Sequence, residues 1–176
     1  MRSDEALYEQ LLQGDLDAFD ALYARYERHL FGFIVSRISD RSEAEDVLHD
    51  AFMAVLRERQ AGRSVTSFRA WLFQIARNLC LNRLRSRQRA AAALATVART
   101  PAVAAALPEQ ALQQQQTTTA LNAAVARLPE HLAELFRLRA GGLSYDELAQ
   151  VLALPLGTIK SRMHELVSRL RAEVQS

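Results

Sequence analysis

Hydroxyl, cationic and imidazole side chains crowd the start of one expected helix near the end of the chain: Thr158, Lys160, Ser161, Arg162 and His164. Such side chains can bind phosphates, and Lys and Arg also pair with the acceptor atoms of guanine. The positive end of a helix dipole favours a phosphate at the same place. The segment therefore predicts a helix that meets nucleic acid with its first turns; the alternative is an ordinary surface helix that carries these charges.

Amide and guanidinium side chains lie together on a second expected helix, over residues 68–86, away from its apolar residues: Gln74, Arg77, Asn78 and Arg85. Side chains of these types can bind both base edges and phosphates. Trp71 lies on the apolar stripe of the same helix, so we assign it to the core rather than to base stacking. The preceding segment RERQAGRSVTS adds hydroxyls and arginines, including Arg63 and Ser64, and a glycine for close approach.

Acidic and polar residues mark a third expected helix, over residues 43–57, outside its apolar stripe: Glu43, Asp46, His49 and Asp50. An acidic, amphipathic helix suits docking on another helix of opposite charge. A solvated surface face is the alternative reading of the same pattern.

The charges are unevenly distributed, although the net charge is only +2. Residues 1–60 hold thirteen acids and seven bases, whereas residues 61–100 hold eight arginines and no acid. A block of arginines without counter-charge suits a polyanionic partner or, equally, a solvated helix face.

Other kinds of site are not indicated by the sequence. It has no phosphate-binding loop, nucleophile elbow or paired-histidine metal motif, so we expect no enzymatic activity, cofactor, metal or small-molecule substrate. A single cysteine, Cys80, excludes internal disulfides, and we expect a packed thiol there. No apolar run approaches the roughly 20 residues of a membrane span, and the N-terminus does not resemble a signal peptide, so we expect a cytoplasmic protein without membrane insertion.

The elements that position these residues are helices almost throughout, because apolar residues recur at helical spacing. We predict an all-α fold of two small helical domains joined by a flexible linker: a first domain over residues 1–88, a low-complexity linker over residues 89–119 and a second domain over residues 120–176. Asp40 or Ser42, and Ser67, are the expected helix caps of the first domain.

The second domain has the pattern of a helix-turn-helix. Gly141 and Gly142 should stop one helix, and Ser144 with Glu147 three residues later forms a capping box for the next. After the turn LPLG, a longer helix should run from about Thr158 to Val174, with Ile159, Met163, Leu166 and Leu170 toward the core.

The segment LPEHLAELFRLRAGGLSYDELAQVLALPLGTIKSRMHELVSRLR resembles region 4 of the extracytoplasmic-function (ECF) sigma factors of bacterial RNA polymerase. The segments AFDALYARYERHLFGFI, SEAEDVLHDAFMAVL and FRAWLFQIARNLCLNRLR resemble parts of region 2 of that family. The resemblance covers residues of about 17–88 and 121–172.

The resemblance implies a transcription initiation factor that binds core RNA polymerase, promoter DNA and an anti-sigma factor. Region 4 would bind the −35 element and the polymerase β flap. In region 2, the acidic helix would dock on the β′ clamp helices. The helix of residues 68–86 and the loop before it would read and hold the melted −10 element, and these residues include Asn82, where many relatives have aspartate.

Two other functions account for part of the sequence. A stand-alone helix-turn-helix regulator would explain the second domain, but not the acidic and arginine-rich helices. A protein that binds polymerase without reading promoters would not need Lys160 or Arg162.

Glu165 departs from the family pattern, and we expect it to face solvent.

Overall fold

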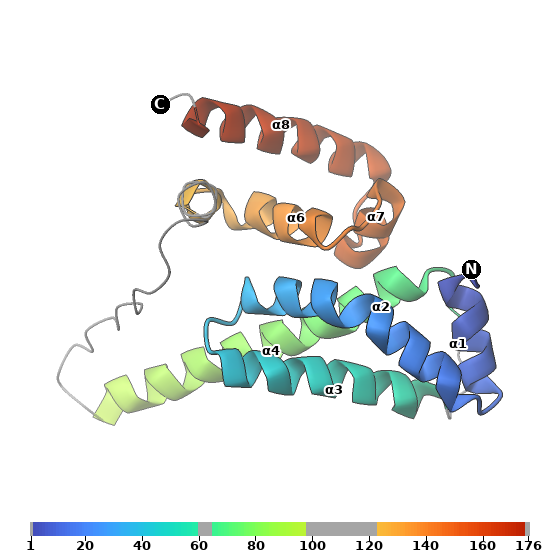
Figure 1. Ribbon diagram of the computed structural model, residues 1–176. Helices are drawn as coiled ribbons and strands as arrows, with labels where there is room; N and C mark the ends of the chain where they lie inside the picture. The colour runs from blue at the N-terminus through green and yellow to red at the C-terminus, as the bar shows by residue number, and fades with distance from the viewer. Residues whose placement is uncertain (1, 60–64, 98–122, 175–176) are drawn as a thin grey trace, which may run out of the picture.

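The computed structural model describes residues 2–59, 65–97 and 123–174, which are helical wherever they form regular secondary structure (Figure 1). Four helices form the N-terminal bundle: α1 (Asp4–Leu12), α2 (Leu16–Val35), α3 (Arg41–Arg59) and α4 (Phe68–Val97). Three helices form the C-terminal unit: α6 (Glu130–Ala140), α7 (Tyr145–Leu152) and α8 (Leu156–Val174), preceded by a short helical segment over residues 123–126. This confirms the predicted all-α fold class with two helical units.

The helices of the bundle begin where short polar side chains can accept hydrogen bonds from the first free backbone N–H groups. Ser3 and Asp15 cap α1 and α2. Asp40 Oδ1 accepts from Glu43 N at 2.9 Å, and Ser67 Oγ accepts from Ala70 N at 3.1 Å. Of the two residues expected to cap α3, Asp40 therefore makes the bond.

Helix α4 continues to Val97, beyond the end expected at residue 86 and into the segment predicted as linker. Alanine has the highest helix propensity, and the run of alanines after Arg89 lets the helix continue without a packed core. The residues of this extension are exposed where their side chains are described. The rest of the predicted linker, residues 98–119, lies outside the described residues.

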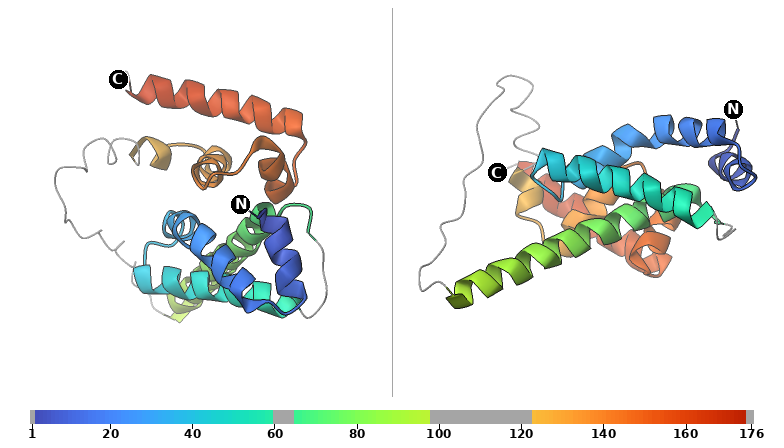
Figure 2. Two further views of the ribbon diagram at one scale, coloured as in Figure 1. Left: turned by 45° about the vertical axis from the view of Figure 1, so that its right-hand side comes forward. Right: turned by 90° about the horizontal axis from the view of Figure 1, so that it is seen from below.

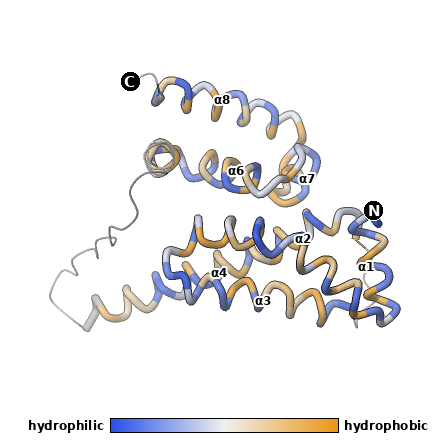
Figure 3. Tube along the Cα trace, viewed as in Figure 1, coloured by the Kyte–Doolittle hydropathy of each residue, from blue (hydrophilic) through white to orange (hydrophobic). Residues whose placement is uncertain are grey.

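Apolar side chains from all four bundle helices meet in the N-terminal core, and hydrophobic and hydrophilic residues alternate along each helix (Figure 3). Trp71 packs against Tyr8 and Phe68, with ring centroids 5.2 and 6.0 Å away, as its place on the apolar stripe predicts. Helix α1 is thereby packed against the first turn of α4.

The C-terminal unit stacks on the bundle through α6 and α7, while α8 lies on their far side (Figures 1 and 2). One continuous hydrophobic cluster includes buried residues of both units, with Phe73 and Ala76 from α4 and Leu135, Leu138 and Leu148 from the C-terminal unit. The two units therefore share a core.

Candidate nucleic-acid interface

Helices α7 and α8 form the expected helix-turn-helix. The predicted capping box is present, since Ser144 Oγ accepts from Glu147 N and Glu147 Oε2 accepts from Ser144 N at 2.7 Å. The turn places Ala153 in the left-handed region, with φ of 51°. Helix α8 then begins at Leu156, two residues earlier than expected, so the predicted DNA-binding residues lie in its first three turns.

Buried apolar residues fix the orientation of α8. Ile159 and Leu166 are 0% and 2% exposed, and Met163 is half-buried against the same cluster. This spacing leaves the opposite face of the helix to solvent. The expected core-facing stripe of α8 is therefore present.

The predicted DNA-binding residues of α8 lie beside and opposite that stripe. Lys160, Ser161 and His164 are exposed, whereas Thr158 and Arg162 are half-buried. Ser161 Oγ donates to the Thr158 carbonyl at 3.0 Å, a local bond that a phosphate could replace. Within residues 2–59, 65–97 and 123–174, no carboxylate pairs with Lys160 or Arg162, so both cations are available to a ligand.

Glu165, which could repel a phosphate, is held by a cation of the same helix. Arg169 donates to Glu165 Oε1 at 3.0 Å, one turn along α8. The glutamate side chain is 44% exposed, in keeping with the expected solvent-facing position. This pairing offsets the negative charge beside the predicted DNA-binding residues.

The predicted polar face of α4 has two parts. Gln74, Asn78 and Asn82 are exposed at intervals of four residues, and Arg85 is exposed one turn farther on. Arg77 lies beside this stripe and is only 24% exposed in its side chain. Arg63 and Ser64, predicted to act with them, lie outside the described residues.

The predicted polymerase-binding face of α3 is partly paired with α4. Asp46 and His49 are exposed. Glu43 accepts a hydrogen bond from Arg87, and Asp50 Oδ2 pairs with Arg83 Nη2 at 3.2 Å. The side chains of Arg83 and Asp50 are 42% and 43% exposed, and a pair at such a position contributes only about 0–1 kcal/mol, so a cationic partner could exchange with Arg83. The Glu43 side chain is only 17% exposed.

An open groove between α2 and α3 borders the same face, with a volume of about 610 Å³. Aromatic and apolar side chains form part of its lining, and charged residues of both signs form its rim: Tyr23, Glu27, Arg28, Phe31, Arg41, Glu45, Leu48 and His49. Such a surface can accept a helix that has both apolar and charged side chains.

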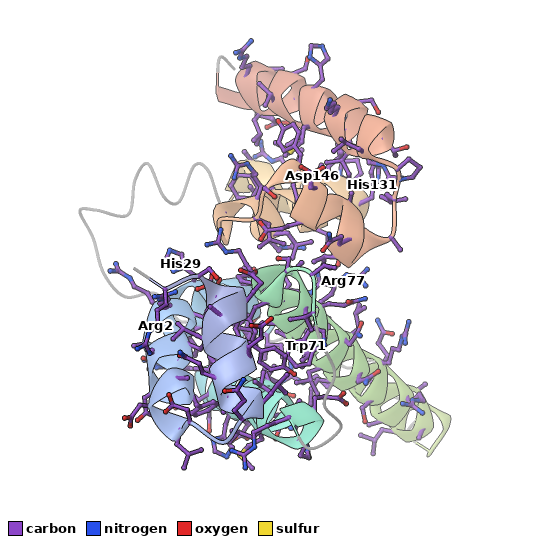
Figure 4. The ribbon with its side chains drawn as sticks, turned by 90° about the vertical axis from the view of Figure 1, so that its right-hand side faces the viewer. Arg2, His29, Trp71, Arg77, His131 and Asp146 are labelled. Atoms are coloured by element: carbon purple, nitrogen blue, oxygen red, sulfur yellow. The ribbon has the colours of Figure 1, made fainter. Side chains whose placement is uncertain are left out.

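Glu134 of α6 joins the C-terminal unit to α4 and to the turn after α2. Arg77 binds its carboxylate with two bonds, from Nε to Oε1 at 2.9 Å and from Nη2 to Oε2 at 3.2 Å. Arg37, in the turn after α2, donates to Oε1 at 3.1 Å, and its side chain is 5% exposed. We call Glu134, Arg37 and Arg77 the Glu134 cluster; Arg77, a predicted DNA-binding residue of α4, is labelled in Figure 4.

Three further contacts surround this cluster. Ser67, the cap of α4, donates through Oγ to Glu147 of α7 at 3.0 Å. Arg69 Nη1 donates to the carbonyl of Gly142 at 3.0 Å. A methyl group added at Gly141 would come within 2.6 Å of Phe73 Cε1, so the glycine permits the close approach of α6 to α4.

Arg69 also connects this turn to the N-terminal helices. Its Nε donates to Tyr26 at 3.3 Å, and the Tyr26 hydroxyl donates to Asp4 of α1. Burial and the bond to Asp4 raise the pKa of Tyr26 well above its usual value, so the phenol stays protonated and keeps donating. These bonds fix the first turn of α4, directly after the segment that includes Arg63 and Ser64.

Cys80 is buried on α4, and burial raises the pKa of its thiol to about 11. This agrees with the packed thiol expected from the sequence. Among the residues that the structure describes, no three His, Cys, Asp or Glu side chains are grouped so that they could hold a metal ion. No helix in these described ranges is long and apolar enough to cross a bilayer.

Sequence reasoning did not single out Arg37, Glu134 or the contact between Gly141 and Phe73. Glu134 lies 57 and 97 residues from its two partners, and nothing in the segment PEHLAELFRLRA separates it from an ordinary solvent-exposed glutamate. Gly141 was expected only to stop a helix. Its φ of −69° is accessible to any residue. The role of this glycine is therefore to permit close packing against Phe73, and not to allow a special backbone conformation.

Comparisons with known proteins match both units. Residues 22–90 match the family Sigma-70 region 2, and residues 118–170 match the family Sigma-70, region 4. The RNA polymerase sigma-H factor of Pseudomonas aeruginosa is 31% identical over 91% of this chain and 88% of its own length. The ECF RNA polymerase sigma-E factor of Escherichia coli K12 is 30% identical over 98% of this chain and 95% of its own length.

Two solved structures have a similar fold. CnrH, in complex with the cytosolic domain of CnrY, has a TM-score of 0.70 at 25% identity and covers 98% of this chain and 97% of its own. The sigma factor RpoE of Bartonella quintana, in complex with the anti-sigma factor NepR, has a TM-score of 0.68 at 25% identity and covers 89% of this chain and 96% of its own.

Proposed function

Because the chain belongs to the ECF sigma factors of RNA polymerase, we propose that its two units divide promoter recognition between α8 and α4. Sigma factors are transcription initiation factors and not enzymes. The N-terminal bundle corresponds to region 2 and the C-terminal unit to region 4.

Helix α8 is the reader of the −35 element. Lys160 and Arg162 bind phosphates or guanine acceptors, and Thr158, Ser161 and His164 supply the remaining hydrogen bonds. The observation that supports this assignment is the orientation of α8: Ile159 and Leu166 are buried, which leaves its first turns free to enter a groove. A recognition helix meets DNA in this way with its N-terminal residues.

Helix α4 is the reader of the −10 element. The exposed stripe of Gln74, Asn78 and Asn82 can bind the edges of unpaired bases, and Arg77 and Arg85 can bind the phosphates of the single strand. Arg63 and Ser64, in the segment before α4, act with this face. Asparagine at position 82 donates as well as accepts hydrogen bonds, unlike the aspartate of many relatives.

The outer face of α3 binds core RNA polymerase. Glu43, Asp46, His49 and Asp50 bind the β′ clamp helices, and the groove beside them receives apolar side chains of that partner. The C-terminal unit contacts the β flap. These functions place the protein in the cytoplasm, where the polymerase acts.

An anti-sigma factor is a further partner that we propose for this chain. RpoE of Bartonella quintana binds the anti-sigma factor NepR, and CnrH binds the cytosolic domain of CnrY. The present chain shares their fold over most of its length. Co-purification of a partner whose removal restores transcription would test this assignment.

A stand-alone helix-turn-helix regulator is not favoured, because residues 22–90 match Sigma-70 region 2. The remaining alternative is a protein that binds polymerase without reading promoters. Its activity would not depend on the DNA-binding residues of α8. It predicts that replacing Lys160 and Arg162 with alanine leaves initiation unchanged.

In vitro transcription with core polymerase and a promoter library tests the function. We expect promoter-specific initiation that requires this chain. The double variant K160A/R162A should lose about 100-fold in initiation at promoters that depend on their −35 element, since each lost contact costs roughly 1–3 kcal/mol.

The matched control is Arg171→Ala, which removes a cation from the last turn of the same helix. Its initiation rate should stay within about twofold of the parent chain. Initiation by K160A/R162A at the parent rate would instead support the polymerase-binding alternative. Binding of duplex DNA by the chain alone, with no dependence on polymerase, would support the stand-alone helix-turn-helix regulator.

A further inference from the structure

The exposed stripe of α4 presents three side-chain amides at one regular spacing. Gln74, Asn78 and Asn82 are exposed and follow one another at intervals of four residues. In the described part of the chain, none of these three amides makes a hydrogen bond. The amides are therefore available to a ligand that displaces no other protein contact.

The charged side chains next to the stripe are in a different state. Arg77 binds Glu134 with two bonds, and Arg83 pairs with Asp50 at 3.2 Å. The segment from residue 74 to residue 82 contains no acidic residue. The groups that a base edge meets on this stripe are therefore neutral amides, and not unpaired cations or carboxylates.

Neutral amides distinguish the bases by the pattern of donors and acceptors in the major groove. Adenine presents the N7 acceptor beside the N6 donor, and the NH2 and C=O groups of one amide complement this pair with two hydrogen bonds. Guanine presents two acceptors, which suit arginine or lysine, and cytosine presents a donor, which suits a carboxylate. The chemistry of the stripe therefore favours adenine.

The spacing of the amides also fits stacked bases. Residues four apart in an α-helix are separated by about 6.0 Å along its axis. Stacked bases are about 3.4 Å apart, so two steps cover about 6.8 Å. Asn78 and Asn82 therefore match two adenines that are separated by one base. Gln74 continues the same spacing beyond Asn78.

We propose that Asn78 and Asn82 determine base specificity in the −10 element, where each binds N6 and N7 of one adenine and one base separates the two adenines. The inference rests on the proposed function of α4 as the reader of that element, and it deepens this function by naming the bases. Arg85, exposed about one turn beyond Asn82, can bind a neighbouring phosphate.

Position 82 makes the proposal specific to this chain, because many relatives have aspartate there. A carboxylate accepts hydrogen bonds but donates none, so it pairs with N4 of cytosine and not with both adenine atoms. The base preference at the position that Asn82 reads should therefore differ from that of a chain with aspartate, and one substitution should interchange the two preferences.

A promoter library that is randomised over the −10 element, with a constant −35 element, tests this inference in transcription with core polymerase. The parent chain should enrich adenine at two positions of one strand with one base between them. Asn82→Asp should change the ratio of adenine to cytosine at one of these positions by about tenfold in favour of cytosine. Asn78→Asp should do the same at the other position. A purely structural role would lower initiation at all sequences alike.

Gln88→Asp is the matched control for the added charge. It places a carboxylate at an exposed position of α4 outside the stripe. Both adenine preferences should stay as in the parent chain. Circular dichroism should show the same helix content in all three aspartate variants, since the replaced side chains are exposed.

Replacement of a single base atom tests the proposed contact directly. In 7-deazaadenine, C–H replaces N7 and base pairing is retained. At the adenine read by Asn82, this base should lower initiation by the parent chain about fivefold, the value for one lost hydrogen bond. Asn82→Ala should initiate equally from both bases, because the lost contact is the same one. Templates that are paired or premelted over the −10 element distinguish reading in the duplex from reading of an unpaired base, and a loss on either supports the proposal.

Two kinds of failure can be told apart. If the chain initiates with promoter preference but enriches no adenine pair, or if its preference is unchanged in both Asn82→Asp and Asn78→Asp, this inference is wrong and the proposed function stands. If the chain does not initiate with core polymerase, or shows no preference within the −10 element, the proposed function of α4 is wrong and the inference is overturned with it.

Discussion

Helices α4 and α8 both carry polar side chains suited to DNA, but they differ in how the rest of the chain uses them. Among the described residues, the exposed cations of α8 have no carboxylate partner except Arg169, which pairs with Glu165 of the same helix. On α4, Arg77 binds Glu134, while Arg83 and Arg87 bind acids of α3. The two helices thus differ in what must be displaced before DNA can bind.

This difference has a physical origin in the position of each helix. Helix α8 lies at the edge of the molecule and buries one stripe only. Helix α4 packs against α1, α2, α3 and α7, so its cations lie close to carboxylates of several other elements. The cations Arg77, Arg83 and Arg87 of α4 must therefore exchange a carboxylate before they can bind DNA.

Truncation of Phe73 should produce the largest effect, because this ring lies in the part of the core that both units share. Phe73 is fully buried, 5.5 Å from the Phe33 ring and against Gly141. Phe73→Ala should lower the free energy of unfolding by about 3–5 kcal/mol, measured by urea denaturation.

Val167→Ala on α8 is the control for this prediction. Val167 is 40% exposed, so its truncation should change the unfolding free energy by no more than about 0.5 kcal/mol. Equal losses in the two variants would contradict the distinction between an embedded α4 and a peripheral α8.

The reactivity of the Cys80 thiol measures how well this part of α4 is protected from solvent. Burial raises the pKa of this thiol from 9.0 to about 11, so at pH 8 the reactive thiolate is about 100-fold less populated than in an exposed cysteine. Alkylation by iodoacetamide should be slower in the native chain than in the urea-unfolded chain by at least this factor.

The pH dependence of stability has a definite sign for this group. Because the folded pKa lies above the unfolded value, the contribution of Cys80 to stability is fully present below about pH 9 and is lost as the pH rises toward 11.

In the alkylation measurement, a native rate within tenfold of the unfolded rate would show that solvent reaches this part of α4 in the folded chain.

Replacement of Arg77 should have a smaller effect, because it removes one proposed phosphate ligand. Arg77→Ala also breaks the Glu134 cluster. We expect initiation at promoters with a −10 element to fall about tenfold, the value for one lost charge-assisted bond.

Arg89→Ala is the comparison variant, because Arg89 is an exposed cation near the end of α4 and bonds only to the carbonyl of Arg85 among the residues that the structure describes. Its initiation should stay within about threefold of the parent. If both variants initiate as well as the parent chain, Arg77 does not hold the −10 strand.

The parts of the fold that depend on neighbouring residues were predictable from the sequence. Ser144 and Glu147 are three residues apart and form the expected capping box. The stripe of Ile159 and Leu166 is buried as helical spacing requires. In each case, residues within two turns determine the outcome, so periodicity and capping rules are sufficient.

The contacts between the units could not be predicted in this way. Glu134 and Arg37 are 97 residues apart, and their pairing depends on how two separate helical units pack. The extension of α4 to Val97 was also not expected, because the alanine run packs against no core and its helicity depends on intrinsic propensity. The proposed roles of Arg63 and Ser64 stay predictions, since both lie outside the described residues.

The most direct measurement is the binding of this chain to purified core polymerase that lacks a specificity subunit, followed by transcription from a promoter library. We expect a complex with one chain per polymerase and promoter-specific initiation. Absence of a complex, or a complex that starts transcription without promoter preference, would contradict the central claim.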